Sequence, residues 1–199
     1  PDFDTPDIIK QAAVRAIQSG FTKYTAVGGI PELKNAIIHK FKHDNNLDFE
    51  PAHILISNGA KQSLFNIFFA TLNKGDEVII PAPYWVSYPA MVEMCEGVPV
   101  YIECPAEKDF KMTADQLRAA ITTKTKWVMY TSPNNPTGSA YSKDELKEIV
   151  EVLREHKHVG LISDEIYEEL IYKGKHISPA TVAPDLLDRM FIVNGVSKS

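Results

Sequence analysis

The amino-acid sequence predicts an α/β fold, a three-layer αβα sandwich around a mostly parallel sheet. Two observations predict it: helical and strand patterns alternate along the chain, and the strand-like segments are nearly unbroken apolar runs. Such runs are typical of strands that are covered by helices on both faces, as in parallel sheets. The six runs are residues 54–56, 78–80, 98–102, 127–130, 159–162 and 191–193.

The expected helices have recognisable starts and stops. In the first, Thr5 is the expected N-cap and Pro6 the first helical residue, and apolar residues recur at helical spacing until Gly20. A second helix is expected to begin at Pro31 and to end near Asn46.

Two later helices are predicted by capping boxes, in which Thr113 pairs with Gln116 and Ser142 pairs with Glu145. Between these pairs and the second helix, a further helix is expected after residue 60. Its apolar stripe, which we expect in the core, is Phe65, Phe68, Phe69 and Leu72.

Composition narrows the class of protein. The 199 residues are 44% hydrophobic and 24% charged, as in an ordinary globular domain. A net charge of -5 with scattered basic residues argues against binding to nucleic acid or to a membrane surface, and no apolar run is long enough to span a membrane. Cys95 and Cys104 lie in no metal-ligand spacing, and His156 and His158 lack ligand partners, so we expect a cytoplasmic protein without a metal site.

Chemically active side chains follow the strand-like runs where each run ends. The segments concerned are residues 57–61, 81–85, 132–138, 164–167 and 195–198. In open parallel sheets, ligands bind beyond the carboxyl ends of the strands. We therefore expect one binding site at that edge, with carboxylate, phenol, indole, amide and amine groups around it.

Seven segments carry a resemblance to a known family. They are PDFDTP, KYTAVGGIPELK, NGAKQ, PYWVSYP, SPNNPTG, SDEIYEEL and NGVSKS. In this order, over the whole chain, the sequence resembles the fold-type I pyridoxal-phosphate-dependent aminotransferases of class I and II, most of all the bacterial aspartate aminotransferases. The resemblance implies an N-terminal segment with the first helix in residues 1–25 and a cofactor-binding large domain in residues 26–199, without the domain's C-terminal part and the small domain.

The resemblance implies pyridoxal 5′-phosphate as the cofactor and Lys198 as the lysine that forms its Schiff base. Such a lysine also moves a proton during the reaction, which requires burial that leaves part of its amine uncharged. Asp164 matches the carboxylate that keeps the pyridine nitrogen protonated. Tyr167 and Asn135 match residues that hydrogen-bond the ring oxygen. The alternatives are a helix-capping aspartate, a buried tyrosine and a turn asparagine.

Other matched residues would hold the phosphate, the ring and the substrate. Gly59, Ala60 and Lys61 would turn backbone N–H groups at a helix start toward the phosphate. Lys61 also matches a position near the substrate's side-chain carboxylate, and Trp85 matches the aromatic residue that stacks on the ring. Together with Asn135, these two residues would contact the substrate.

Tyr24 matches a tyrosine that reaches the cofactor phosphate of the neighbouring subunit, which implies a homodimer. Gly195 departs from the pattern, because the family usually has a serine there that contacts the phosphate. The family's arginines for the phosphate and for the substrate carboxylate would lie beyond Ser199. We therefore expect a piece of a longer protein, inactive by itself.

The expected reaction is transamination between an L-amino acid and a 2-oxo acid, with aspartate and 2-oxoglutarate as the leading pair. One alternative keeps the cofactor but changes the substrate to an aromatic amino acid, alanine or prephenate, or changes the reaction to that of a lyase. A non-enzyme alternative is the aminotransferase-like sensor domain of a transcription regulator, which would need a DNA-binding domain before it. A nicotinamide-binding domain is disfavoured, because no G-x-G-x-x-G segment follows the first apolar run.

Overall fold

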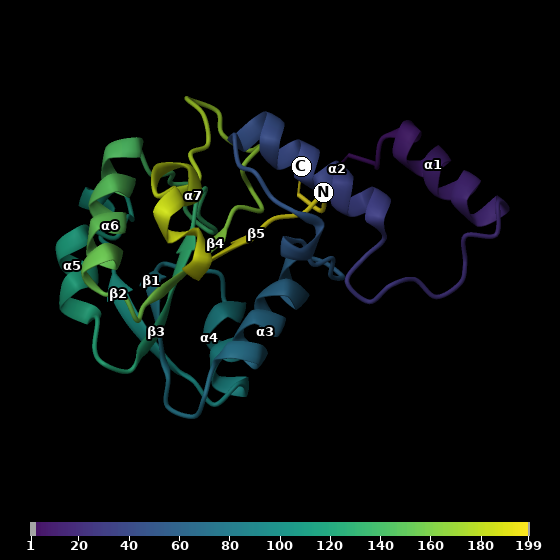
Figure 1. Cartoon of the computed structure of the whole chain (residues 1–199). Coiled ribbons are helices and arrows are strands. Elements are labelled where there is room, and N and C mark those ends of the chain that lie inside the picture. Colours follow the sequence, from purple (N-terminus) through teal and green to yellow (C-terminus); the bar gives the residue numbers. More distant parts are fainter. Residues whose placement is uncertain (1–2, 199) are drawn as a thin grey trace.

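The computed structural model describes residues 3–198, which form a five-stranded sheet with helices on both faces (Figure 1). The strand order is β2-β1-β3-β4-β5, and each neighbouring pair is parallel. The strands are β1 (Glu77–Ala82), β2 (Val98–Glu103), β3 (Thr125–Thr131), β4 (Gly160–Asp164) and β5 (Met190–Val193). The predicted three-layer α/β class is confirmed.

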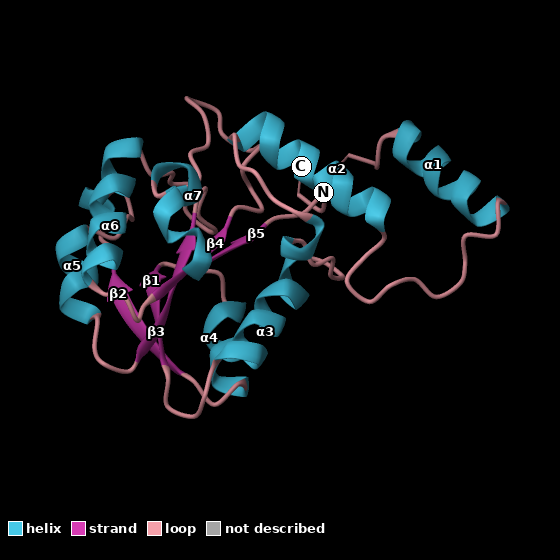
Figure 2. Cartoon of the chain, viewed as in Figure 1, coloured by secondary structure: helices cyan, strands magenta, loops and turns pink. Residues whose placement is uncertain are grey.

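Figure 2 shows the helices around this sheet. The α-helices are α1 (Asp7–Gln18), α2 (Pro31–Asn45), α3 (Ala60–Thr71), α4 (Ser87–Met94), α5 (Ala114–Ala120), α6 (Lys143–Glu155) and α7 (Pro179–Val182). Short 3-10 turns span Pro51–His53, Ala106–Lys108 and Pro184–Arg189.

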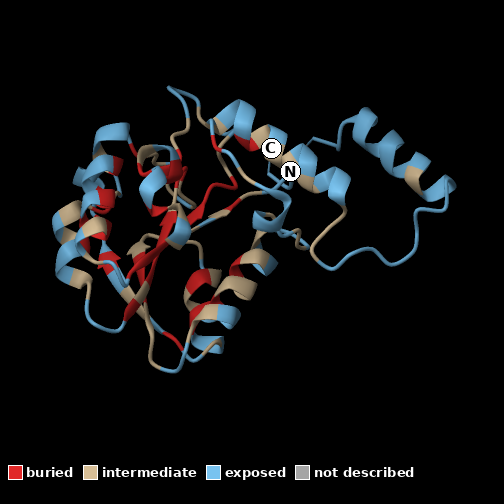
Figure 3. Cartoon of the chain, in the orientation of Figure 1, coloured by how far each residue is buried: buried red, intermediate tan, exposed pale blue. Residues whose placement is uncertain are grey.

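The core lies on both faces of the sheet, as the unbroken apolar runs predict. Ile79 of β1 packs in the cluster that includes α5 and α6, whereas its neighbours Val78 and Ile80 pack in the cluster with α3 and α4. Successive strand residues point to opposite faces, so both faces must be apolar when helices cover both. Figure 3 shows this buried layer along the strands.

The capping predictions hold for the later helices. The Thr113 and Ser142 side chains each accept a hydrogen bond from the backbone N–H three residues on, at the starts of α5 and α6. Helix α2 begins at Pro31 and ends at a left-handed Asn46, also as predicted. The start of α1 was predicted one residue early, because the N-cap is Pro6 rather than Thr5 and no side chain caps the helix.

Residues 54–56 do not form a strand, so this part of the prediction is wrong. Leu55 is 61% exposed, and the Ile56 N–H donates to the carbonyl oxygen of Gly28 rather than to a strand of the sheet. A strand needs a neighbour that continues its hydrogen-bond ladder. Within residues 3–198, β2 and β5 are the edges of the sheet, and residues 54–56 pair with neither.

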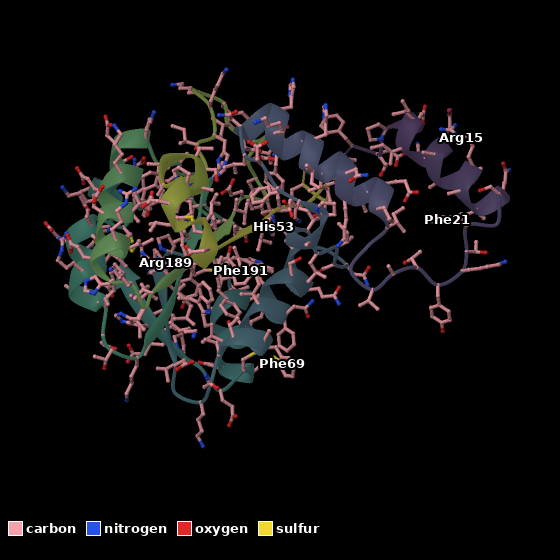
Figure 4. All side chains as sticks on the ribbon, viewed as in Figure 1. Arg15, Phe21, His53, Phe69, Arg189 and Phe191 are labelled. Atoms are coloured by element: carbon pink, nitrogen blue, oxygen red, sulfur yellow. The ribbon has the colours of Figure 1, made fainter. Side chains whose placement is uncertain are left out.

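The apolar stripe of α3 is only partly in the core. Phe68 is fully buried, but Phe69 is 73% exposed and points away from the sheet (Figure 4). Consecutive helical residues differ in direction by about 100°, so the two cannot face the sheet together. Phe69 instead stacks on Phe65, with ring centroids 5.9 Å apart.

Helix α1 stands apart from the sheet, at the far end of a long connecting loop (Figure 1). It buries none of its residues, and Arg15 and Phe21 lie well away from the strands (Figure 4). The division at residue 25 therefore stays a prediction. No helix in residues 3–198 combines the length and the apolar character that a membrane crossing requires.

Candidate functional site

The sheet brings the ends of its strands to one edge, as expected for parallel strands. Asp164, the last residue of β4, lies in register between Thr131 at the end of β3 and Val193 at the end of β5. Apart from Tyr24, the predicted site residues end or follow β1, β3, β4 or β5, or lie at the start of α3, so the polar groups of several segments lie around this carboxyl edge.

Asp164 is buried and held by two donors. It is 3% exposed, and its Oδ2 accepts a 2.7 Å hydrogen bond from the Tyr88 hydroxyl. The backbone N–H of Ile166 donates to Oδ1 at 3.2 Å. Burial raises the pKa of the Asp164 carboxyl above its ordinary value, although both donors act in the opposite direction. A carboxylate with a raised pKa at a strand end is a candidate functional group.

Tyr88 contacts Asp164 and is a site residue that the sequence did not predict. Its hydroxyl proton goes to Asp164, and it also hydrogen-bonds the Thr131 hydroxyl at 2.9 Å. Burial, followed by the charge of Asp164, raises the pKa of Tyr88 well above its ordinary value, so it remains a donor. The signal was present in the segment PYWVSYP, because Tyr88 lies three residues after Trp85 at the start of α4. The two rings meet edge to face at 5.4 Å.

Asn135 and Tyr167, which the resemblance assigns to one cofactor atom, contact each other in the structure. The Asn135 Nδ2 donates to the Tyr167 hydroxyl oxygen at 3.3 Å, although 32 residues separate the two in the sequence. Asn134 has a different task, since its amide donates to the Pro83 carbonyl and to the Thr137 hydroxyl within the turn. Of these two neighbouring asparagines, Asn135 is therefore the one whose amide hydrogen-bonds the Tyr167 hydroxyl.

The turn before α3 has the features of an anion site. Gly59 has φ 85° and ψ 162°, a conformation that residues with a Cβ rarely adopt, and it caps α3 without a side-chain hydrogen bond. The first N–H groups of a helix attract anions. Ser57 just before this turn has a buried hydroxyl that no described residue hydrogen-bonds. Such an orphan is typical of a site that receives a ligand or a water.

Lys61 and Trp85 also meet at this edge. The Lys61 Nζ lies 4.9 Å from the centroid of the Trp85 ring, a cation–π contact. Ala60 and Lys61 begin α3, and Trp85 follows β1. The contact therefore joins two segments that the resemblance assigns to the same site.

Two predicted site residues do not join this group within the described chain. Tyr24 is fully exposed on the loop between α1 and α2. Lys198 is exposed beyond β5, so residues 3–198 do not provide the burial expected of it. Gly195, in the same segment, is exposed as well.

A cluster of acidic residues with a histidine lies next to the site. Ligand atoms of Glu165, Glu168 and His176 lie within 4.8 Å of one another. The Glu165 carboxylate already receives the hydroxyls of Ser163 and Ser178 and a 2.7 Å contact from the His176 Nε2. Because these internal partners occupy it, we interpret the cluster as a structural network.

The comparisons with known proteins agree with this geometry. One family model, aminotransferase class I and II, matches residues 1–199. The chain belongs to this family. It is 58% identical, over its whole length, to a Rickettsia bellii protein named "Probable aspartate/prephenate aminotransferase" and 54% identical to a Cereibacter sphaeroides protein named "Aspartate/prephenate aminotransferase". In each case the chain spans 50% of the relative's length.

Solved structures of the family have the same fold. The crystal structure of the aspartate aminotransferase from Rhizobium meliloti gives a TM-score of 0.98 at 52% identity, and that of Thermus thermophilus with maleate gives 0.95 at 47%. This chain is covered completely in both comparisons but spans 50% and 51% of those chains.

The site residues fit the cofactor of this aminotransferase family. Pyridoxal phosphate has an anionic group, a basic ring nitrogen and a phenolic ring oxygen. The structure offers a glycine-capped helix start at Gly59, a buried carboxylate at Asp164 and the donor pair of Asn135 and Tyr167. The donor set thus matches the three polar features of the cofactor.

Proposed function

We propose that the full-length protein is a pyridoxal-phosphate-dependent aminotransferase that transfers the amino group of L-aspartate to 2-oxoglutarate. The observation that carries the proposal is the buried Asp164, held by Tyr88 and in register with its neighbours at the carboxyl edge of the sheet. L-aspartate as the substrate is supported by the names of the relatives, which include aspartate aminotransferases.

Pyridoxal phosphate supplies an electron sink for the charge that develops at the amino acid's α-carbon. Asp164 would hold a proton at the ring nitrogen, because a nearby carboxylate favours the protonated form. Asn135 and Tyr167, which already contact each other, would orient the ring by hydrogen-bonding its oxygen. Trp85 would pack against the ring and exclude water from it.

The remaining residues bind the cofactor's ends and move the proton. The N–H groups at Gly59, Ala60 and Lys61 bind the phosphate at the start of α3. Lys198 would hold the cofactor through its amine, and that amine would be the base that moves a proton between substrate atoms. Lys61 attracts the second carboxylate of aspartate, while its contact with Trp85 fixes its direction.

We propose a homodimer in which Tyr24 reaches the phosphate of the neighbouring subunit. Its full exposure on a loop beyond the sheet supports this role, because an aromatic ring there is free to contact a second chain. A cytoplasmic location is supported by the two free cysteines, Cys95 and Cys104.

The test uses the full-length protein loaded with pyridoxal phosphate. We expect the visible absorbance of lysine-bound cofactor, its loss in Lys198→Ala, and its bleaching by L-aspartate with restoration by 2-oxoglutarate. Exposed Lys175 provides the matched control, Lys175→Ala, which should keep all three properties. Retention of the absorbance in Lys198→Ala would contradict the assigned lysine, and bleaching by another amino acid but not by aspartate would contradict the substrate.

A second acceptor is prephenate, a 2-oxo acid that the names of the Rickettsia bellii and Cereibacter sphaeroides relatives include. We propose it as an alternative partner for the same aspartate-loaded enzyme. Prephenate or 2-oxoglutarate, at equal concentration, is added to the protein whose cofactor has taken up the amino group of aspartate. The return of the lysine-bound cofactor's absorbance shows which of the two accepts the amino group. If only 2-oxoglutarate restores the absorbance, the prephenate alternative is wrong.

A further inference from the structure

The carboxylate of Glu168 joins three segments that are far apart in the sequence. Its side chain is only 8% exposed. Its Oε1 forms an ion pair with Lys40 of α2 and also accepts a 2.7 Å hydrogen bond from the Asn194 amide. Its Oε2 accepts a hydrogen bond from the amide of Asn45, the last residue of α2. A mostly buried carboxylate that uses both oxygens in this way fixes the relative positions of the groups it joins.

Asn194 connects this junction to Lys198. It directly follows β5, and its Oδ1 accepts the N–H of Gly195 at 2.7 Å, so both ends of its amide are fixed. Four residues of extended chain reach at most ~14 Å. Lys198 lies four residues after Asn194, so Asn194 sets where the segment that presents the lysine begins, within that reach.

Glu168 also follows Tyr167 directly in the sequence. The turn after β4 thus carries the phenol of the candidate site on one residue and the anchor of the lysine segment on the next. Its other neighbour, Glu169, is exposed. Two adjacent glutamates therefore differ in environment, and only one of them is built into the junction.

We propose that Glu168 is a positioning residue for Lys198: through Asn194 it holds the lysine segment in register with the Asp164–Tyr167 turn. This inference rests on the proposed function, in which Lys198 binds the cofactor. Glu168 itself touches neither substrate nor cofactor in this account.

The test compares Glu168→Gln with Glu169→Gln in the full-length, cofactor-loaded protein. Glutamine keeps the shape of glutamate, but its NH2 group must face either the Lys40 and Asn194 donors at the Oε1 position or the Asn45 donor at the Oε2 position. All of these groups can only donate, so at least one contact is lost. We expect Glu168→Gln to shift the midpoint of the pH titration of the lysine-bound cofactor's absorbance. We also expect kcat to fall about tenfold with little change in KM, since a misplacement of ~1 Å can cost up to ~100-fold. Glu169→Gln should stay within about twofold of the parent.

A second variant, Asn194→Ala, removes the donor and leaves the ion pair between Glu168 and Lys40 intact. It should reproduce the absorbance shift, and it carries the test if Glu168→Gln does not fold. A lower melting temperature with an unchanged absorbance midpoint and unchanged kcat would mean a purely structural role and would overturn the proposal. If the parent protein shows no lysine-bound absorbance at all, the proposed function fails first, and this inference falls with it.

Discussion

At the scale of single residues, Asp164 shows how the site lowers the stability of the fold. The carboxylate is buried, and burial raises its pKa because the charged form loses solvation. Its partners are neutral: the Tyr88 hydroxyl and the Ile166 N–H. Because no residue within 3–198 forms an ion pair with Asp164, its charged form destabilises the folded chain. In the proposed function this carboxylate pairs with the protonated ring nitrogen.

Asp164→Asn should therefore stabilise the cofactor-free protein at neutral pH. Because the folded-state pKa of Asp164 is raised, its contribution to stability is full below the unfolded pKa and is lost as pH rises through the folded pKa. The asparagine variant should gain about 0.5–2 kcal/mol at pH 7, and the gain should vanish below pH ~3, where the carboxyl is mostly protonated in both states.

Urea unfolding of the cofactor-free protein across this pH range measures the effect. Asp188→Asn, at an exposed position, serves as the control and should change little at any pH. A gain that persists unchanged below pH ~3 would show that relief of the charge is not its cause.

At the scale of elements, the start of α3 depends on one glycine. Gly59 adopts a positive φ, yet a Cβ there would meet nothing within 4 Å, so conformation rather than space demands glycine. Gly75 shares the positive φ and the open surroundings but lies in the turn before β1. Substitutions at these two glycines can therefore be compared to separate the effect of backbone strain at the anion site from its effect elsewhere.

Gly59→Ala should weaken cofactor binding, whereas Gly75→Ala should not. Both substitutions should cost about 1–3 kcal/mol of stability, the usual size of such backbone strain. Only the first redirects the N–H groups of α3, so we expect its dissociation constant for pyridoxal phosphate to rise at least ~10-fold, or ~1.4 kcal/mol. Fluorescence titration of the cofactor-free full-length variants checks this. Equal affinities for the two variants would remove the phosphate role of the α3 turn.

At the scale of the whole molecule, the proposed site draws residues from two subunits. Helix α1 buries nothing, and Tyr24 follows it on an exposed loop. Lys198 is exposed beyond β5. The roles proposed for both residues need surroundings beyond residues 3–198, and the chain spans about half the length of its relatives.

Hybrid dimers test the composite site. Tyr24→Ala and Lys198→Ala should each lower activity as homodimers, but each hybrid dimer contains one site with both natural residues. We expect the mixture to regain activity, up to about half of the parent value per hybrid dimer, because a two-fold dimer has two equivalent sites. Activity that stays at the level of the two homodimers would show that Tyr24 does not serve the partner's site.

The sequence alone determined the α/β class and the starts of α2, α5 and α6, and it predicted that Asn135 and Tyr167 serve one site. These follow from local patterns, or from motif positions that parallel strands carry to one edge. Only the tertiary structure showed that Tyr88 holds Asp164, that Phe69 faces outward, that residues 54–56 form no strand and that Glu168 joins α2 to the lysine segment. The physical reason is range: capping and periodicity act within a few residues, whereas each of these features depends on a neighbour that only the folded chain brings into contact, or leaves out.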